Sequence, residues 1–422
     1  MKNYFGLISM FALTAGISFV NQMVYAYYFG VSTEFDMLNA ILALPLAIIG
    51  IGNGAVTLIV MPILNDAEEK FGNCSSTLVS LLKKYYIYIL FIIIIIVLIQ
   101  ISIFYNQIDN IYKKRFIYLS MSVGIFLFLN FVNAFFIAYF NLKKDFLLAS
   151  ISAMFIYIIS ILMCILFADE IGINIVIIAF IISNIILLCY FIYKFYPNYK
   201  QINNNEVVLN DKIKFKALIS GIFSIFPFSL PIFIDSYYLL SLGTGSLSYV
   251  SYANKMIIMI TSILIQPLNL ILFPKILSKI SSKDFLPIKR ILLYLYVFTF
   301  IGIILVYFIS NLFFLYLMHI FFENGKFTHE DSIIVYHVFL IYLIGAFGMV
   351  AMNIQNKILT SLKLYNIQIY SSLVFILLYF FLMSILYETK GYLSSAISYA
   401  ICWCLYTIFA AIILKKKFFI ND

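Results

Sequence analysis

Twelve apolar segments, each long enough to cross a lipid bilayer as a helix, dominate the sequence. A membrane-spanning helix needs about 20 apolar residues, and the clearest segment, Tyr85 to Tyr105, has Gln100 as its only strongly polar residue. Backbone N–H and C=O groups find no water inside a bilayer, so segments of this kind are predicted to be helical. The predicted spans are approximately 4–29, 37–64, 85–105, 116–140, 147–168, 172–193, 216–241, 247–274, 291–317, 333–361, 366–386 and 391–413. The fold class expected is an all-α polytopic membrane protein with about twelve transmembrane helices.

The composition agrees with this class and excludes several others. Hydrophobic residues make up 64% of the chain and charged residues 11%, whereas soluble domains carry about 25% charged residues. The net charge of +9 reflects an excess of Lys and Arg residues, which membrane proteins usually carry in their cytoplasmic loops. We therefore do not interpret it as a sign of nucleic-acid binding and expect no nucleic-acid partner. The 5 cysteines form no CxxC pair and the 3 histidines lack metal-ligand spacing, which predicts no metal site. No GxxxxGK loop is present, so we expect neither ATP hydrolysis nor a bound cofactor.

Loop charges predict the orientation of the chain in the membrane. If the N-terminus is cytoplasmic, most of the 27 Lys and Arg residues fall in inner loops and tails. An excess of positive charge on the cytoplasmic side is the usual pattern of membrane proteins. One outer loop departs from it, because Lys113, Lys114 and Arg115 lie there, but the other loops outweigh it. We therefore expect both termini in the cytoplasm.

A polar stretch near residues 196–214 predicts two six-helix lobes, 1–200 with spans one to six and 201–422 with spans seven to twelve. An internal repeat favours this division. Segments 29–64 and 242–277 both begin with an apolar–Gly turn and end in Pro and Ile-Leu. Six spans per lobe give both copies the same orientation, which is the parallel repeat seen in alternating-access transporters.

Two charged residues lie inside predicted spans, Asp235 and Lys255. A charge at the bilayer centre costs roughly 2.5–3.5 kcal/mol on insertion scales, so such residues pair with each other or face a wet cavity. In an antiparallel hairpin of spans seven and eight, both would lie at similar depth. One interpretation is a structural ion pair between the two helices. The other is a cavity in which Lys255 attracts an anionic substrate and Asp235 takes a proton or cation.

Other polar residues cluster in the first two spans. Asp36 opens span two, where a helix N-terminus favours an acid. Asn21 and Gln22 interrupt span one and Asn53 interrupts span two, either to bond neighbouring helices or to line a shared polar cavity.

Prolines interrupt spans at matching places in the two halves. Pro45 lies in span two, Pro227 and Pro231 in span seven, and Pro267 and Pro274 in span eight. Proline removes a helix hydrogen bond and kinks the helix. We expect bending at these spans, since interrupted helices in corresponding positions indicate a transport site.

Three motifs carry a resemblance to a known family. They are FGVSTEFDMLNAILALP with its continuation NGAVTLIVMPIL in 29–64, FIDSYYLLSLGTGSLSYVSYANKM in 233–256, and ENGKFTHEDS in 323–332. In this order they resemble the MurJ/MviN lipid II flippases, which belong to the multidrug/oligosaccharidyl-lipid/polysaccharide (MOP) exporter superfamily. The resemblance implies the MOP flippase fold of two lobes with twelve core helices.

The resemblance also implies a cargo, a location and a set of site residues. The cargo would be an undecaprenyl-diphosphate-linked saccharide, turned from the cytoplasmic to the outer leaflet of a bacterial inner membrane by a protein that we expect to be monomeric. Its transport would be driven by the membrane potential or by H⁺ or Na⁺. The substrate-binding residues implied are Lys255, Asn21, Asp36, Asn53 and Asn254, and the ion-coupling residue implied is Asp235.

This sequence departs from the family pattern at two of those positions. Asn21 falls where the family has Arg, and Asn53 falls where it has Glu. The chain also shows twelve spans, two fewer than peptidoglycan flippases. The expected cargo is therefore lipid II or a surface-polysaccharide unit.

Three alternatives stay open at the level of sequence. A drug or metabolite/cation antiporter of the same superfamily would use Asp36 and Asp235 in an acidic cavity. A membrane-embedded glycan-processing enzyme is disfavoured because the outer loops are short. A scaffold without transport would tolerate Ala at Asp36, Asp235 and Lys255.

Overall fold

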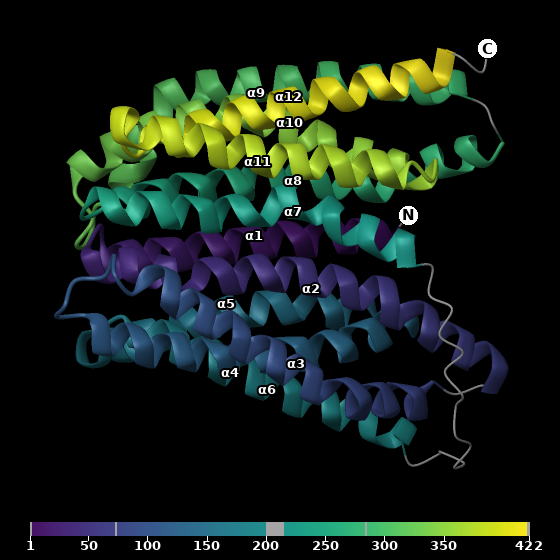
Figure 1. The fold of residues 1–422 in the computed structure, drawn as a ribbon, viewed down its shortest axis with the longest axis horizontal. Helices are drawn as coiled ribbons and strands as arrows, with labels where there is room; N and C mark the ends of the chain where they lie inside the picture. The colour runs from purple at the N-terminus through teal and green to yellow at the C-terminus, as the bar shows by residue number, and fades with distance from the viewer. Residues whose placement is uncertain (1, 72–73, 200–214, 283–284, 420–422) are drawn as a thin grey trace. The chain divides into compact units, whose positions relative to one another are not determined.

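The structure, a computed structural model, describes residues 2–71, 74–199, 215–282 and 285–419 (Figure 1). Within these residues the chain forms twelve α-helices, one short 3-10 turn and no strand. The helices are α1 (Lys2–Phe29), α2 (Thr33–Phe71), α3 (Ser75–Phe104), α4 (Lys113–Leu142), α5 (Phe146–Ile171), α6 (Asn174–Tyr199), α7 (Phe215–Leu239), α8 (Ser246–Ser281), α9 (Phe285–Phe321), α10 (His329–Ser361), α11 (Tyr365–Lys390) and α12 (Leu393–Phe419), with the 3-10 turn η1 (Leu240–Leu242) after α7. The predicted all-α class is confirmed.

Eleven stretches of the described residues are long and apolar enough to cross a membrane, and they lie in α2 to α12. The span predicted at 4–29 corresponds to α1. Helix α2 continues past Pro45, and α7 continues past Pro227 and Pro231. The side chains of Pro267 and Pro274 lie outside the described residues, and the bending expected at these prolines stays a prediction.

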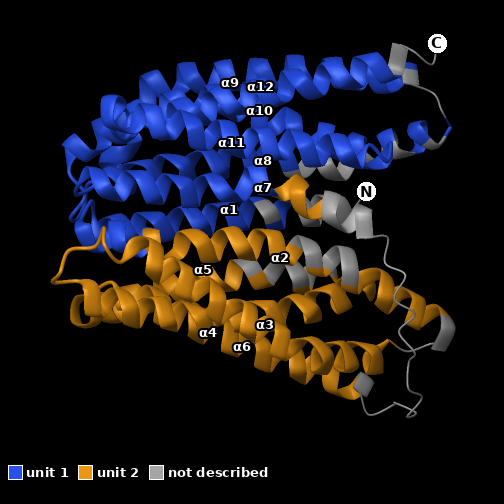
Figure 2. Ribbon diagram, viewed as in Figure 1, with its two compact units in different colours: residues 1–39, 226–422 blue, residues 40–225 orange. Residues whose placement is uncertain are grey.

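The chain divides into two compact units (Figure 2). Unit 1 consists of residues 1–39 and 226–422, and unit 2 of residues 40–225. Unit 1 therefore includes α1 and the first turns of α2 together with the helices of the second half of the chain. The two lobes expected at 1–200 and 201–422 were defined by the sequence repeat, not by compactness, and they stay a prediction.

Unit 2 is built on contacts among α3, α4, α5 and α6. Aromatic side chains fill its core, with Tyr139 of α4 and Phe191 of α6 fully buried. At one end, the Lys143 ammonium lies 2.6 Å from the Glu68 carboxylate, which also accepts a hydrogen bond from the Cys74 N–H. Burial raises the pKa of Glu68, but the hydrogen bonds and charge of Lys143 and the Cys74 donor outweigh it and lower that pKa.

Unit 1 is organised around α10, which packs against α8, α9 and α12. Two glycines of α10 allow α12 to approach closely. A Cβ atom at Gly348 would lie 2.5 Å from the Trp403 carbonyl oxygen, and one at Gly345 would overlap the Tyr399 ring. Small residues of this kind let the backbones of membrane helices come into contact.

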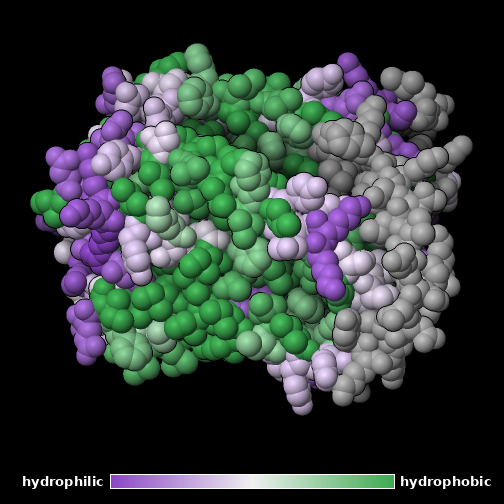
Figure 3. Space-filling view, turned by 60° about the horizontal axis from the view of Figure 1, so that its bottom comes forward, coloured by the Kyte–Doolittle hydropathy of each residue, from purple (hydrophilic) through white to green (hydrophobic). Residues whose placement is uncertain are grey.

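The exterior is strongly apolar, as a lipid-facing surface requires. Hydrophobic residues cover the middle of the face in Figure 3, and hydrophilic residues gather at its left edge and beside the residues drawn in grey. In α3 and α9 only 22% and 17% of the most apolar stretch is buried inside the protein. Large side chains such as Tyr88 and Leu312 are exposed there, which in water would be unfavourable and in lipid is not.

We predict that Gly348→Ala destabilises unit 1. The added Cβ atom would overlap the Trp403 backbone, which cannot change rotamer to make room as a side chain could. Overpacking of this kind lowers the free energy of unfolding by about 1–3 kcal/mol. Gly302→Ala in α9 is the matched control, since no atom lies within 4 Å of its Cβ position. Melting temperatures in detergent should fall for Gly348→Ala and stay level or rise for Gly302→Ala. Equal melting temperatures would show that α10 and α12 are not in close contact.

Candidate functional site

Asp36 binds the N-terminus of α8. Its side chain is 2% exposed, and its two carboxylate oxygens accept hydrogen bonds from the Gly245 N–H at 2.5 Å, the Ser248 N–H at 2.7 Å and the Ser248 hydroxyl at 2.5 Å. The first N–H groups of a helix have no partners within the helix, and a carboxylate satisfies them. The structure therefore gives Asp36 a capping role between the first turn of α2 and α8.

Other contacts join the α1–α2 corner to the rest of unit 1. The Tyr252 hydroxyl donates to the Gly30 carbonyl at 3.1 Å, and the Lys326 N–H donates to the Tyr27 carbonyl at 3.0 Å. Gly325 lies against the Tyr27 backbone, too close for a Cβ atom. The corner is therefore held between α8 and the α9–α10 loop.

The same loop begins α10 with a capping box. The Thr328 side chain accepts from the Asp331 N–H, and the Asp331 carboxylate accepts from the Thr328 N–H at 2.8 Å. The nearby Glu323 carboxylate accepts from the Ser332 hydroxyl and contacts two histidines. Burial raises the pKa of Glu323, but these hydrogen bonds, led by that of Ser332, lower it overall, so the carboxylate is ionised at neutral pH.

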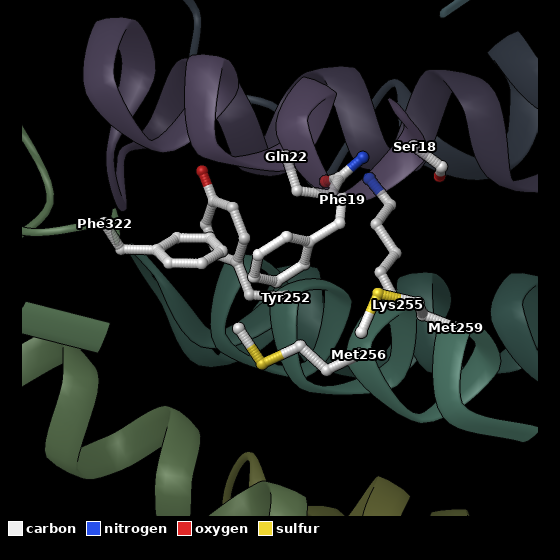
Figure 4. A pocket seen from close by; sticks show the side chains of 8 residues that line it. All are labelled: Ser18, Phe19, Gln22, Tyr252, Lys255, Met256, Met259 and Phe322. Carbon is white, nitrogen blue, oxygen red and sulfur yellow. The ribbon is translucent and has the colours of Figure 1, made fainter. Parts of the chain in front are cut away.

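Lys255 lies midway along the apolar part of α8 and faces a small cavity between α1, α8 and Phe322 (Figure 4). The cavity has a volume of about 10 Å³, room for one water molecule. The Lys255 ammonium lies 5.9 Å from the centre of the Tyr25 ring and 5.8 Å from that of Phe35. These distances allow cation–π attraction, which partly replaces the lost hydration of the charge.

Two buried amides of α1 lie at the same level as this cation. Gln22 lines the Lys255 cavity, and its side-chain oxygen has no hydrogen-bond partner within the described residues. Asn21, 1% exposed, also has an unpartnered side-chain oxygen. An unpaired buried oxygen costs about 1–3 kcal/mol, so this stretch of α1 retains polar capacity for water or a ligand.

Asp235 faces a second cavity, formed by α7, α8, α10 and α12 and of about 30 Å³. Asn254 lines the same cavity, so the structure brings these two predicted residues together. The Asp235 carboxylate, 3% exposed, accepts a hydrogen bond from the Tyr379 hydroxyl of α11 at 2.7 Å. The Tyr379 hydroxyl lies 3.3 Å from the Ser395 hydroxyl, which lies 2.6 Å from that of Tyr342.

Asp235 and Lys255 form no ion pair within the described part of the chain. They line different cavities, because the neighbours Asn254 and Lys255 point about 100° apart around α8. The structural ion pair allowed by the sequence is therefore absent here. The other interpretation placed both charges in one cavity, whereas in the structure each charge lines a cavity of its own.

Asn53 belongs to unit 2, in α2, where its side chain is exposed. The remaining five predicted residues belong to unit 1. Sequence reasoning missed the hydroxyl chain of Tyr379, Ser395 and Tyr342. The one signal available was the run of serines at the start of α12, which is polar for a predicted span.

The family model described as lipid II flippase MurJ matches residues 25–422. The chain belongs to this family. A search of curated proteins found no match. The resemblance of the three sequence motifs to MurJ-type flippases is thereby confirmed.

Solved structures confirm the MOP flippase fold. A lipid II flippase MurJ in an inward closed conformation is 20% identical, with a TM-score of 0.74 over 98% of this chain and 89% of that chain. A MATE transporter from Vibrio cholerae is 13% identical, with a TM-score of 0.68 over 99% and 98% of the two chains. A MOP superfamily transporter from Pyrococcus furiosus is 15% identical, with a TM-score of 0.60 over 97% and 95%.

We predict that Asp36→Ala lowers stability more than Glu34→Ala does. Both residues are acids in the first turn of α2, so both substitutions lose a similar helix-dipole contribution. Only Asp36→Ala leaves the donors of Gly245 and Ser248 unpaired, at a cost of about 1–3 kcal/mol. Thermal unfolding of the two purified variants is the measurement. Identical losses would argue against the capping role.

Proposed function

We propose that this chain moves an undecaprenyl-diphosphate-linked saccharide from the cytoplasmic to the outer leaflet, with Lys255 contacting the diphosphate. Membership of the MurJ family supports a flippase of lipid-linked saccharides. The proposal extends this to a multi-pass protein of the bacterial inner membrane with both termini in the cytoplasm. It involves no bond-making step, so the protein acts as a transporter and not as an enzyme.

The observation that carries the proposal is a cation in a candidate membrane span that has no carboxylate partner in the described part of the chain. Lys255 forms no ion pair with any described carboxylate, although a charge at this depth costs roughly 2.5–3.5 kcal/mol. Such residues mark substrate or ion pathways. An ammonium and unpaired amide oxygens suit a hydrated diphosphate attached to a sugar, whose hydroxyls donate hydrogen bonds.

The Lys255 cavity is too small for a diphosphate as it stands, so the proposal requires it to widen when cargo binds. Alternating access supplies such a change, since two states of one transporter differ in which side their cavity faces. Asn254 and Asp36 would then act on the cargo through α8, by positioning the helix that carries Lys255. Asn21 remains a proposed contact of the saccharide.

The Asp235 cavity is the proposed ion-coupling site, for H⁺ or Na⁺. Its one carboxylate, the Asn254 amide and the hydroxyl chain from Tyr379 supply oxygen atoms and exchangeable protons. A volume of about 30 Å³ suits a water molecule or a small cation.

We predict that Lys255→Ala reduces transport at least about tenfold while the protein still inserts. The loss of a charge-assisted hydrogen bond costs about 1.5–3 kcal/mol, and each 1.4 kcal/mol is tenfold. Lys194→Ala, which removes an exposed cation of α6, is the control. The measurement is flipping of fluorescent lipid II, and separately of an O-antigen or capsule precursor, in proteoliposomes, with Lys255→Arg expected to retain most activity.

Complementation of a bacterium depleted of its own lipid II flippase tests the same proposal in cells. Growth with the wild-type chain but not with Lys255→Ala would support lipid II as the cargo. Full transport of every lipid-linked saccharide by well-inserted Lys255→Ala would overturn the role of Lys255.

We predict that Asp235→Asn abolishes the response of transport to an ion gradient. The amide keeps an acceptor for the Tyr379 hydroxyl but loses the charge that takes up a proton or cation. Asp109→Asn, in an exposed loop, is the control. Flipping should be compared with and without a pH gradient and with and without a Na⁺ gradient. A variant that responds to both gradients as the wild type does would exclude Asp235 as the coupling residue.

A further inference from the structure

An apolar groove with a cationic end lies between α9 and α12, away from both cavities described above. Its volume is about 490 Å³, within the range of 300–1,000 Å³ typical of pockets for small ligands. Leucines and an alanine form most of its wall, among them Leu286, Leu293 and Leu414. Three cations line it as well, Lys289 and Arg290 of α9 and Lys415 of α12.

The groove is built into the packing of unit 1. Tyr296 of α9 lines it, and its hydroxyl accepts a hydrogen bond from the Gln355 amide of α10 at 2.6 Å. The same amide nitrogen donates to the Thr407 carbonyl of α12 at 3.2 Å. Gln355 therefore joins α9 and α12 across α10, and the wall of the groove is fixed by buried hydrogen bonds.

The charges lie at one end of long apolar helices. Lys289 and Arg290 lie in the first turns of α9, whose stretch Leu286–Phe321 is apolar enough to cross a membrane. Lys415 lies near the end of α12, where Lys416 and Lys417 follow in the last turn. The cations therefore lie at the level of lipid headgroups. Leu292 and Leu293 follow them along α9, and Leu414 precedes Lys415 along α12, so these three leucines lie on the acyl-chain side of the charges.

We infer that this groove binds an anionic phospholipid, with the phosphate on Lys289, Arg290 and Lys415 and an acyl chain along the leucines. Basic pockets between transmembrane helices bind anionic headgroups, and each Lys or Arg near the membrane surface contributes to the attraction. An arginine also binds phosphate in a bidentate manner. A zwitterionic lipid offers the same chains without the net charge, so the three cations favour an anionic lipid.

The charge of the groove is tested with phosphatidylglycerol added to the purified full-length chain in detergent, with phosphatidylcholine as the comparison. We expect phosphatidylglycerol to raise the melting temperature of the wild type, and the double variant Lys289→Gln, Arg290→Gln to need roughly tenfold more of it for the same rise. The matched control is Lys83→Gln, Lys84→Gln, which removes another adjacent pair of cations, on α3, and should respond as the wild type does.

The groove itself is tested with Ala411→Phe, which narrows it without changing any charge. We expect this variant to lose most of the response to phosphatidylglycerol. The inference is overturned if both double variants respond equally, if phosphatidylcholine acts as strongly, or if Ala411→Phe responds as the wild type does. It is also overturned if undecaprenyl diphosphate raises the melting temperature and phosphatidylglycerol does not. These outcomes are independent of the cargo proposed above.

Discussion

The hydrogen bonds between Asp36 and the N-terminus of α8 hold together the helices that form the candidate site. The start of α8 is buried in the protein, where unpaired N–H groups are costly, so it needs a fixed acceptor. Asp36 supplies it from α2, and the Tyr252 hydroxyl of α8 bonds back to Gly30 at the end of α1. Both cavities have α8 as a wall, so their geometry depends on this cap.

The cap also determines which groups surround the Lys255 ammonium on α8. Asp36 directs both of its oxygens to helix donors, so it is not available to neutralise Lys255. The Tyr25 and Phe35 rings come from helices that the cap holds against α8, and they provide cation–π attraction instead. Aromatic rings stabilise an ammonium less than a carboxylate does, which leaves its charge available to an anion.

Hydropathy alone predicted the helices, because each apolar segment is long and bounded by polar loops. The motifs were also readable. The third motif was recognised only as part of a family resemblance. That Gly325 meets backbone and that Thr328 and Asp331 form a capping box was not predicted. Partners across helices were not predictable. Polar and apolar side chains are spread around α8 without a one-sided stripe, so the sequence did not show that Asn254 and Lys255 face different cavities. Tyr379 lies among apolar neighbours in α11, and nothing in the sequence marked it as a partner of Asp235.

The arrangement of the two cavities bears on how an ion gradient would drive the cargo. Asn254 and Lys255 are consecutive residues of one helix, and each lines a different cavity. A rotation or shift of α8 that improves one cavity for its ligand must therefore change the other. Ligands that favour different positions of a shared element are coupled, and the coupling is reciprocal. On the proposed assignment, an ion at Asp235 would alter the affinity of Lys255 for the diphosphate through α8, with no direct contact between the charges.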